Sequence, residues 1–259
     1  MVQFIEVSNN NEAKEELKEL FHIVQTRDLP FQTPKPTKLL ELFVENLSGE
    51  GDIVLDFFAG SSSTAHAVLA VNARDKKHRK FIMIQAEEGN DLRGGEYKTI
   101  AEFGLERIRL AGEKIKKESG ANDVDYGYRV FRVDDTNMND VFYAPSAYTQ
   151  DLIKMLETNI KQDRSAEDIF FECLISWGLP LSLPYEVEQI GGTEVIIYND
   201  GDLIACFDEN ISEDVIDIIA KREPIRAVFV DSIFKNSPEK INLKERFKLL
   251  SPNTTVKVL

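Results

Sequence analysis

Residues 53–64, IVLDFFAGSSST, restrict the fold of this chain more than any other stretch. The apolar run 53–58 is short and is bounded by Gly and Asp, a pattern typical of a strand buried on both faces. The small residues after it favour a tight turn, and residues 65–72, AHAVLAVN, predict a helix. A buried strand that passes through a glycine turn into a helix indicates a ligand site at the carboxyl end of the strand.

Further elements of the first half follow from the apolar period and from the positions of Gly and Pro. We expect helices at 8–21, after Pro36 and at 99–118, and strands at 80–86 and 128–133. The order of strands and helices from residue 53 onward is therefore β-α-β-α-β. This order predicts a parallel sheet with right-handed crossovers, as in half of a Rossmann-like fold.

Composition changes near residue 134, where residues 134–148 lack a sustained period and are typical of a linker. Beyond it we expect helices at 147–161, 166–176 and 212–221, and strands within 187–207, at 226–231 and near 254–259. Asn199-Asp200-Gly201 predicts a tight hairpin turn. The expected fold class is α/β, with a partial Rossmann-like sheet in residues 1–135 and a smaller α+β domain in residues 136–259.

The net charge of the chain and its two cysteines argue against several classes of protein. The chain of 259 residues has a net charge of −14, which argues against a free-standing binder of duplex DNA. Cys173 and Cys206 are too few and too far apart for a disulfide framework or a zinc knuckle, so we expect two buried thiols in a reducing cytosol. The histidines lack metal spacing, so no metal site is expected. No signal segment or membrane span is predicted, and we expect a cytoplasmic protein without a membrane partner.

The glycine turn does not match three common ligand-binding and catalytic motifs. A Walker A loop needs Gly-Lys-Ser/Thr, and no Lys follows Gly60 within the turn. A dinucleotide fingerprint needs three spaced glycines, and this turn has one. A nucleophile elbow needs G-x-S-x-G, but Thr64 stands two positions after Ser62. Gly60 nevertheless allows close approach of the backbone to a ligand, and the hydroxyl-rich turn presents donors at a helix N-terminus.

Four segments in order carry a resemblance to a known family. Residues 31–36, FQTPKP, resemble the F-x-T-x-K-P motif (motif X) of DNA amino-methyltransferases, and residues 56–68 resemble their motif I, D-x-F-x-G-S-G-T-T. Asn72 with residues 79–87, RKFIMIQAE, is similar to an "N…R-x-F-I-x-V-Q-x-P-E" segment, and residues 97–108 contain "YKTI" and "ERI". Together they resemble the modification (Mod) subunit of type III restriction–modification systems, within the β-class of adenine-N6 DNA methyltransferases.

The resemblance implies an enzyme that binds S-adenosyl-L-methionine on a Rossmann-like methyltransferase sheet. Thr33 and Lys35 would lie near the methionine carboxylate, where a cation and donors suit a negative charge. A carboxylate at the end of the first strand would favour the ligand's ammonium. The residues expected to line the methionine end are Asp56, Phe57, Gly60, Ser61, Ser63 and Thr64. Gln85 or Glu87 would hold the ribose hydroxyls, as an acidic side chain does in dinucleotide folds.

Two departures from the family pattern shape the expected function. Ser62 stands where the family usually has Gly. The D-P-P-Y motif, with which the family holds a flipped adenine, does not occur in the sequence. In the β-class order that motif and the target-recognition region precede motif X. We therefore expect this chain to correspond to the C-terminal half of a Mod subunit, with DNA held by the N-terminal half and no residue of this chain catalytic on its own.

Several alternatives stay open at this point. The chain is either the cofactor-binding part of an adenine-N6 methyltransferase or a non-catalytic module in which residues 140–259 dimerise or dock a restriction subunit beside a vestigial pocket. A sheet of three strands leaves an edge, so we expect a homodimer through that edge or exposed apolar surface. The basic turn at 74–80 is either solvated or in contact with phosphates, and we favour the first. Arg107 and Arg109 face either solvent or a partner.

Overall fold

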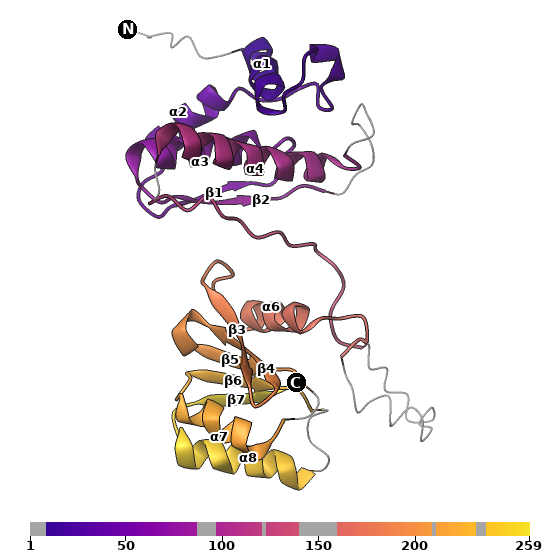
Figure 1. Cartoon of the computed structure of the whole chain (residues 1–259), viewed down its shortest axis with the longest axis vertical. Helices are drawn as coiled ribbons and strands as arrows, with labels where there is room; N and C mark the ends of the chain where they lie inside the picture. The colour runs from indigo at the N-terminus through magenta and orange to yellow at the C-terminus, as the bar shows by residue number, and fades with distance from the viewer. Residues whose placement is uncertain (1–8, 87–96, 121–122, 140–159, 209–210, 232–236) are drawn as a thin grey trace. The chain divides into compact units, whose positions relative to one another are not determined.

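A computed structural model describes residues 9–86, 97–120, 123–139, 160–208, 211–231 and 237–259, the last without the side chains of 237–240. The chain divides into two compact units, Met1–Tyr128 and Arg129–Leu259, which are called unit 1 and unit 2 below (Figure 1). From the sequence, we predicted a cofactor-binding domain that ends at residue 135 and a second domain from residue 136. These functions of the two domains stay predictions.

Two strands of unit 1 form a parallel pair among the described residues. The elements of unit 1 are α1 (Asn10–Leu20), η1 (Thr26–Asp28), α2 (Thr37–Leu47), β1 (Ile53–Asp56), α3 (Ser63–Asp75), β2 (Lys80–Met83) and α4 (Ile100–Ser119). β1 and β2 run parallel in register from Ile53 opposite Lys80 to Asp56 opposite Met83. The predicted helices and the first two strands are confirmed, and α4 ends as expected at Gly120, which is left-handed.

Helices cover one face of this strand pair (Figure 1). Val54 and Phe81 pack against a buried cluster on α2 and α3 that includes Val44 and Val68. Met83 packs against Ile108 and its buried neighbours on α3 and α4. Because side chains alternate between the faces of a strand, these contacts define the inner face of the pair.

The outer face of the pair is apolar and exposed, so the prediction that the first strand is buried on both faces is wrong for the described residues. Ile53, Leu55, Ile82 and Ile84 are each between 48% and 60% exposed. Large apolar side chains on both strands therefore lie outside the core of the described residues. This is the apolar surface expected for an incomplete sheet; pairing with a second copy stays a prediction.

The third strand predicted at 128–133 is wrong. Residues 128–133 pair with no strand among the described residues. Arg129 instead donates hydrogen bonds to the carbonyls of Leu181 and Leu183, and Phe131 packs edge-on against Phe171 with ring centroids 4.9 Å apart. Alternating apolar residues favour extended backbone but do not supply a partner strand, and here the side chains of Arg129 and Phe131 make their contacts within unit 2.

Unit 2 is built on a mixed five-stranded sheet. Its elements are α6 (Ala166–Ser176), β3 (Tyr185–Ile190), β4 (Thr193–Tyr198), η3 (Asn199–Gly201), β5 (Leu203–Cys206), α7 (Glu213–Lys221), β6 (Arg226–Phe229), α8 (Ser237–Leu250) and β7 (Thr255–Val258). The strand order is β3-β4-β5-β6-β7, antiparallel as far as β5 and parallel from β5 to β7.

Most predictions for unit 2 are confirmed. The turn of residues 199–201 joins antiparallel β4 and β5 with positive φ at all three residues. Helices α6 and α7 and the predicted strands are present. The helix predicted at 147–161 lies outside the described residues except at its end. Helix α8 was not predicted.

Unit 2 has three layers (Figure 1). α6 packs on one face of the sheet through Phe170 and Leu174, while α7 and α8 cover the other face through Ile219 and Phe247. Cys173 and Cys206 are free and buried, as expected. Burial raises the pKa of both thiols to about 11, so the thiols are protonated and unreactive at neutral pH.

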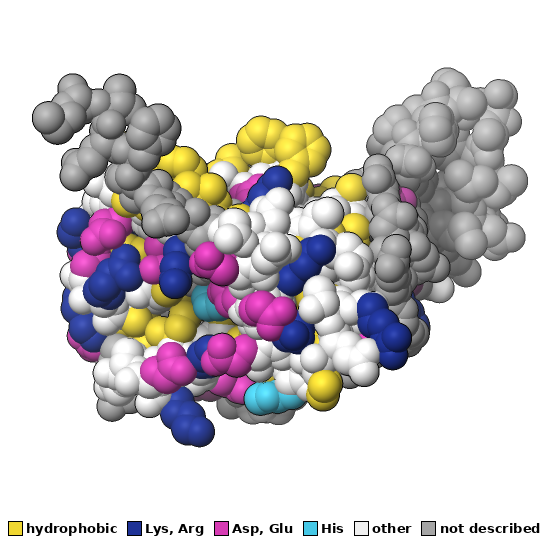
Figure 2. Space-filling view, turned by 90° about the horizontal axis from the view of Figure 1, so that it is seen from above, with side chains coloured by type: hydrophobic (Ala, Val, Ile, Leu, Met, Phe, Trp, Pro, Cys, Tyr) yellow, Lys and Arg dark blue, Asp and Glu magenta, His cyan; other side chains and the backbone are white. Residues whose placement is uncertain are grey.

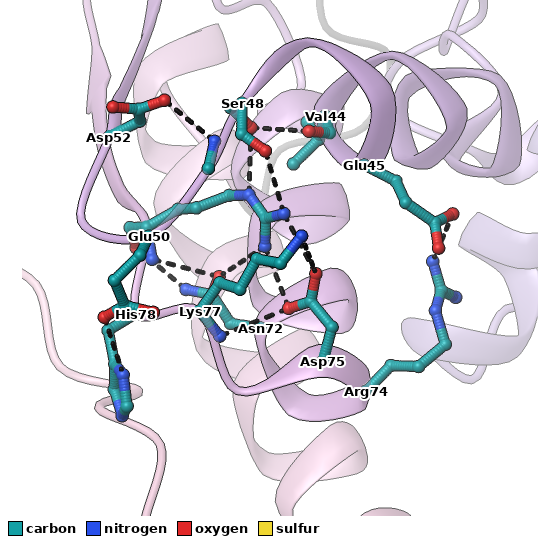
Figure 3. Close-up of polar contacts among 12 residues, drawn as sticks. Val44, Glu45, Ser48, Glu50, Asp52, Asn72, Arg74, Asp75, Lys77 and His78 are labelled. Atoms are coloured by element: carbon teal, nitrogen blue, oxygen red, sulfur yellow. Dashed lines mark hydrogen bonds and ion pairs between the residues drawn. The ribbon is translucent and has the colours of Figure 1, made fainter.

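A buried arginine before β2 joins the end of α2 to the end of α3, where Figure 3 shows Ser48, Asn72 and Asp75. Arg79 directly precedes β2, and its side chain is fully buried. Its guanidinium donates to both carboxylate oxygens of Asp75 at 2.9 Å and to Ser48 Oγ at 2.9 Å. The Asn72 side chain bonds the backbone of Arg79 at 2.8 and 3.1 Å. This network joins α2, α3 and β2 at the end of the sheet opposite the glycine turn.

Most other basic residues of the 74–80 turn are paired with acids. Arg74 bonds Glu41 at 2.9 Å, and Lys76 bonds Asp123 at 2.6 Å. His78 lies 3.2 Å from Glu50 (Figure 3). Cations that are neutralised within the protein are poor phosphate ligands, so these pairs favour the solvated interpretation of the turn.

Candidate functional site

The glycine turn is fixed to the carboxyl ends of both parallel strands. The Ala59 N–H donates to the Ile84 carbonyl at 3.1 Å, and the Gly60 N–H donates to Gln85 Oε1 at 2.8 Å. Gly60 has φ +53°, a conformation that glycine adopts at little cost. The turn therefore presents its backbone at the end of the sheet where ligands bind in parallel α/β proteins.

Asp56 ends β1 and faces this turn. Its Oδ1 accepts a hydrogen bond from the Phe58 N–H at 3.1 Å, and its Oδ2 accepts from Thr64 Oγ1 at 2.6 Å. A carboxylate has about four lone-pair sites, and these bonds use two of them. Asp56 is half-buried, so it is held in place with acceptor capacity left for a cationic group.

The segment 31–37 lies beside the turn. Phe31 Cζ lies 3.7 Å from the point where a Cβ on Gly60 would stand. Thr37, the first residue of α2, is buried and accepts a hydrogen bond from Arg107. Thr33 and Lys35, which lie between these contacts, have exposed side chains. The segments 31–37 and 56–64 thus meet at one end of the sheet.

The structure gives several predicted ligand residues a different visible role. The Ser61 and Ser63 side chains are buried, and their hydroxyls accept hydrogen bonds from Arg107 at 3.1 and 2.6 Å. The Gln85 amide is bonded to the turn and to the Ala86 carbonyl. The described hydrogen bonds of these three side chains are made within the protein and support the conformation of the turn. A contact between them and a cofactor stays a prediction.

Phe57 and Glu87 are the other residues predicted to bind the cofactor. Phe57 is 61% exposed and contacts Phe58. Glu87 lies outside the described residues.

Arg107 on α4 is the residue of the site that sequence reasoning missed. Solvent and a partner were the alternatives for it, but its side chain is fully buried, whereas Arg109 is exposed and pairs with Glu106 and Glu113. The available signal is the helical spacing: Arg107 follows buried Phe103 by four residues and precedes buried Ala111 by four.

Gly104 lets α4 approach the turn closely. A Cβ on this residue would lie 2.6 Å from Ser62 Oγ and 3.0 Å from the Gly60 carbonyl oxygen. Only a residue without a side chain allows this contact between helix and turn.

Two buried side chains beside the turn, His66 and Arg107, have pKa values that burial shifts. Burial, with Arg107 and Lys114 nearby, lowers the pKa of His66 to about 3, so the imidazole is neutral at pH 7. Its Nδ1 lies 3.1 Å from Glu16 but not in hydrogen-bond geometry. Burial also lowers the pKa of Arg107 to about 10, which leaves it cationic. On the face shown in Figure 2, acidic and basic side chains are interspersed, without a large area of one sign.

Two further searches cover the described part of the chain. No group of three or more His, Cys, Asp and Glu side chains in it could hold a metal ion. None of its helices is long and apolar enough to span a membrane.

Part of this chain is similar to known proteins. Residues 3–90 match the DNA methylase family of N6 and N4 methyltransferases. The chain is 39% identical over 130 residues to the StyLTI Mod subunit, a type III restriction–modification enzyme of Salmonella typhimurium, covering 49% of this chain and 19% of that protein. It is 36% identical over 126 residues to the EcoP15I Mod subunit of Escherichia coli, covering 47% and 18%.

A shorter match, 36% identical over 56 residues, is to the type II methyltransferase M.KpnI of Klebsiella pneumoniae and covers 22% of this chain and 13% of that protein. The chain thus matches about a fifth of the length of the Mod subunits. The resemblance inferred from the motifs is confirmed: residues 3–90 match a DNA methylase family model, and about half of the chain is similar to Mod subunits of type III restriction–modification enzymes.

Proposed function

We propose that unit 1 binds S-adenosyl-L-methionine as part of a DNA adenine-N6 methyltransferase of a type III restriction–modification system. The observation that carries the proposal is the meeting of the 31–37 segment, the 56–64 turn and Gln85 at the carboxyl ends of β1 and β2. In parallel α/β sheets this is the end at which ligands bind. The relatedness to type III Mod subunits supplies the reaction class.

The residues at this end fit the cofactor's chemistry. Asp56 has acceptor capacity for the ammonium of the methionine part. Lys35 is exposed on the adjoining segment and would pair with the methionine carboxylate. Gly60 allows the backbone to approach the ligand, and Gln85 or Glu87 would hold the ribose. The bound cofactor supplies the activated methyl group.

Methyl transfer needs more than this pocket. The family holds the target adenine with a D-P-P-Y motif, and the 259 residues contain none. The exposed outer face of β1 and β2 supports a Rossmann-like sheet with further strands and cover. We propose that these 259 residues alone bind cofactor but do not methylate DNA. Adenine methylation by the purified chain with radiolabelled cofactor would contradict this.

One observation favours a second candidate, a non-catalytic module that dimerises or docks a restriction subunit. The hydroxyls of Ser61 and Ser63 turn towards Arg107, which leaves fewer side-chain groups for a ligand. In that case the pocket is vestigial, and the chain does not bind S-adenosylmethionine.

Titration calorimetry with S-adenosylmethionine separates the two candidates. The aspartates at the two ends of β1 form a matched pair, because Asp56 faces the turn whereas Asp52 is exposed before β1 and accepts from the Gly49 N–H. We expect micromolar binding by the wild type and by Asp52→Ala, and loss of binding in Asp56→Ala. Absence of wild-type binding would support the assembly module, and equal binding by both variants would remove Asp56 from the pocket.

A further inference from the structure

Arg107 lies at the centre of a polar cluster behind the glycine turn. Its Nη1 donates to Ser61 Oγ at 3.1 Å and to Ser63 Oγ at 2.6 Å. Its Nη2 donates to Thr37 Oγ1 at 2.9 Å and lies 3.6 Å from Glu16. One guanidinium on α4 thus contacts the glycine turn, the start of α2 and the middle of α1.

These contacts surround a residue in an unfavourable conformation. Ser62 has φ +55° and ψ +34°, and it precedes α3 without a side-chain capping bond. A non-glycine residue persists in the left-handed region only where its surroundings hold it there. Arg107 Nη1 bonds the side chains immediately before and after Ser62, so it holds the turn on both sides of the strained residue.

Stability alone does not account for a charge at this position. The three hydroxyl partners of Arg107 are neutral, and Glu16 stands 3.6 Å away. Its Nε is buried without a hydrogen-bond partner among the described residues. A buried ion pair that is replaced as a whole by apolar side chains of similar volume often keeps its stability, so the contact with Glu16 does not by itself require an arginine here. What arginine adds is a planar fork of donors in fixed directions.

We propose that Arg107 is a positioning residue that holds the turn of residues 59–64 and the segment 31–37 in the arrangement that receives the cofactor. The part of this inference that concerns the cofactor rests on the function proposed above. Arg107 acts through Ser61, Ser63 and Thr37 and does not itself touch the ligand.

Arg79 provides a matched control in the same unit. It too is a fully buried arginine, bonded to Asp75 and to Ser48 (Figure 3). It directly precedes β2 and so lies at the end of the sheet opposite the glycine turn. Replacement of Arg79 by lysine therefore disturbs a buried guanidinium network without altering a contact of the turn.

The test uses the 259-residue chain with the variants Arg107→Lys, Arg107→Met and Arg79→Lys. Backbone amide hydrogen exchange at residues 60–66, without ligand, measures how well the turn is held. Calorimetry measures the Kd for S-adenosylmethionine. We expect both Arg107 variants to exchange at least about tenfold faster at these amides and to bind at least about tenfold more weakly. Arg79→Lys is expected to stay close to the wild type in both measurements.

The two measurements separate failure of this inference from failure of the proposed function. If the wild type does not bind S-adenosylmethionine, the proposed function fails, and exchange at residues 60–66 still decides whether Arg107 holds the turn. Unchanged exchange in both Arg107 variants would overturn the inference. Equal acceleration in Arg79→Lys would overturn it as well, because it would show general loosening of the unit. Arg107→Met keeps the test decisive if Arg107→Lys does not fold.

Discussion

Replacement of Gly104 by alanine tests the packing of α4 against the glycine turn. The added Cβ would stand 2.6 Å from Ser62 Oγ and 3.0 Å from the Gly60 carbonyl oxygen. The second contact is with backbone, which Gln85 holds by a 2.8 Å hydrogen bond to the Gly60 N–H. The turn therefore has little room to move, and we expect strain between helix and turn.

Two opposing effects determine how much Gly104→Ala changes the free energy of unfolding. Overpacking of a close-packed site costs about 1–3 kcal/mol. Alanine is favoured over glycine inside a helix by about 1 kcal/mol. Gly112 on the same helix separates these effects, since a Cβ there would meet Tyr126 and Leu69 only at 3.6 to 3.9 Å, which is ordinary contact. We expect Gly112→Ala to stabilise the protein by about 1 kcal/mol, and Gly104→Ala to be less stable than it by about 1–3 kcal/mol.

The assay is urea unfolding followed by far-UV circular dichroism, with wild type, Gly104→Ala and Gly112→Ala measured side by side. The double variant Ser62→Gly/Gly104→Ala removes the contact with Ser62 Oγ but keeps the contact with the Gly60 carbonyl. Relative to Gly104→Ala, it should recover more than the roughly 1 kcal/mol that Ser62→Gly gains by itself from its left-handed conformation. If Gly104→Ala and Gly112→Ala change the free energy of unfolding equally, the close approach of α4 to the turn is refuted.

Two further predictions concern groups beside the turn. Ser62→Gly should stabilise the chain by about 1 kcal/mol in urea unfolding, because glycine adopts φ +55° without a Cβ penalty; a loss of stability would contradict the left-handed turn. His66 is neutral when folded, with its pKa lowered from 6.5 to about 3, so its stabilising effect is full above pH 6.5 and is lost as pH falls towards 3. Between pH 7 and pH 5 the loss should be about 2 kcal/mol, and His66→Gln should remove that part of the pH dependence.

Much of the local structure was readable from the sequence. The apolar run 53–58 and the small residues after it predicted β1, the turn and the start of α3, because strand and turn propensities depend on residues close in the chain. The hairpin at 199–201 was predicted for the same reason: its residue types tolerate positive φ. The motifs of the first half also predicted the relationship to type III Mod subunits.

Other features depended on contacts between distant segments. Residues 128–133 have a strand-like pattern, but no strand pairs with them among the described residues. Helix α8 has only two strongly buried apolar side chains among those described, Leu243 and Phe247, and its amphipathic pattern is correspondingly weak. A period in the sequence indicates a preferred backbone conformation and does not show which surface is available to pack against it.

The sequence by itself determined the order of the elements in unit 1 and the segments that supply the candidate site. Only the tertiary structure decided that Arg107 is buried behind the turn and that Ser61 and Ser63 face it. Turn and helix propensities act between residues close in the chain, so they can be read from the sequence. Arg107 is 44 residues from Ser63 and 70 from Thr37, and whether a charged side chain at such a position is solvated or buried is settled by which distant segments pack around it.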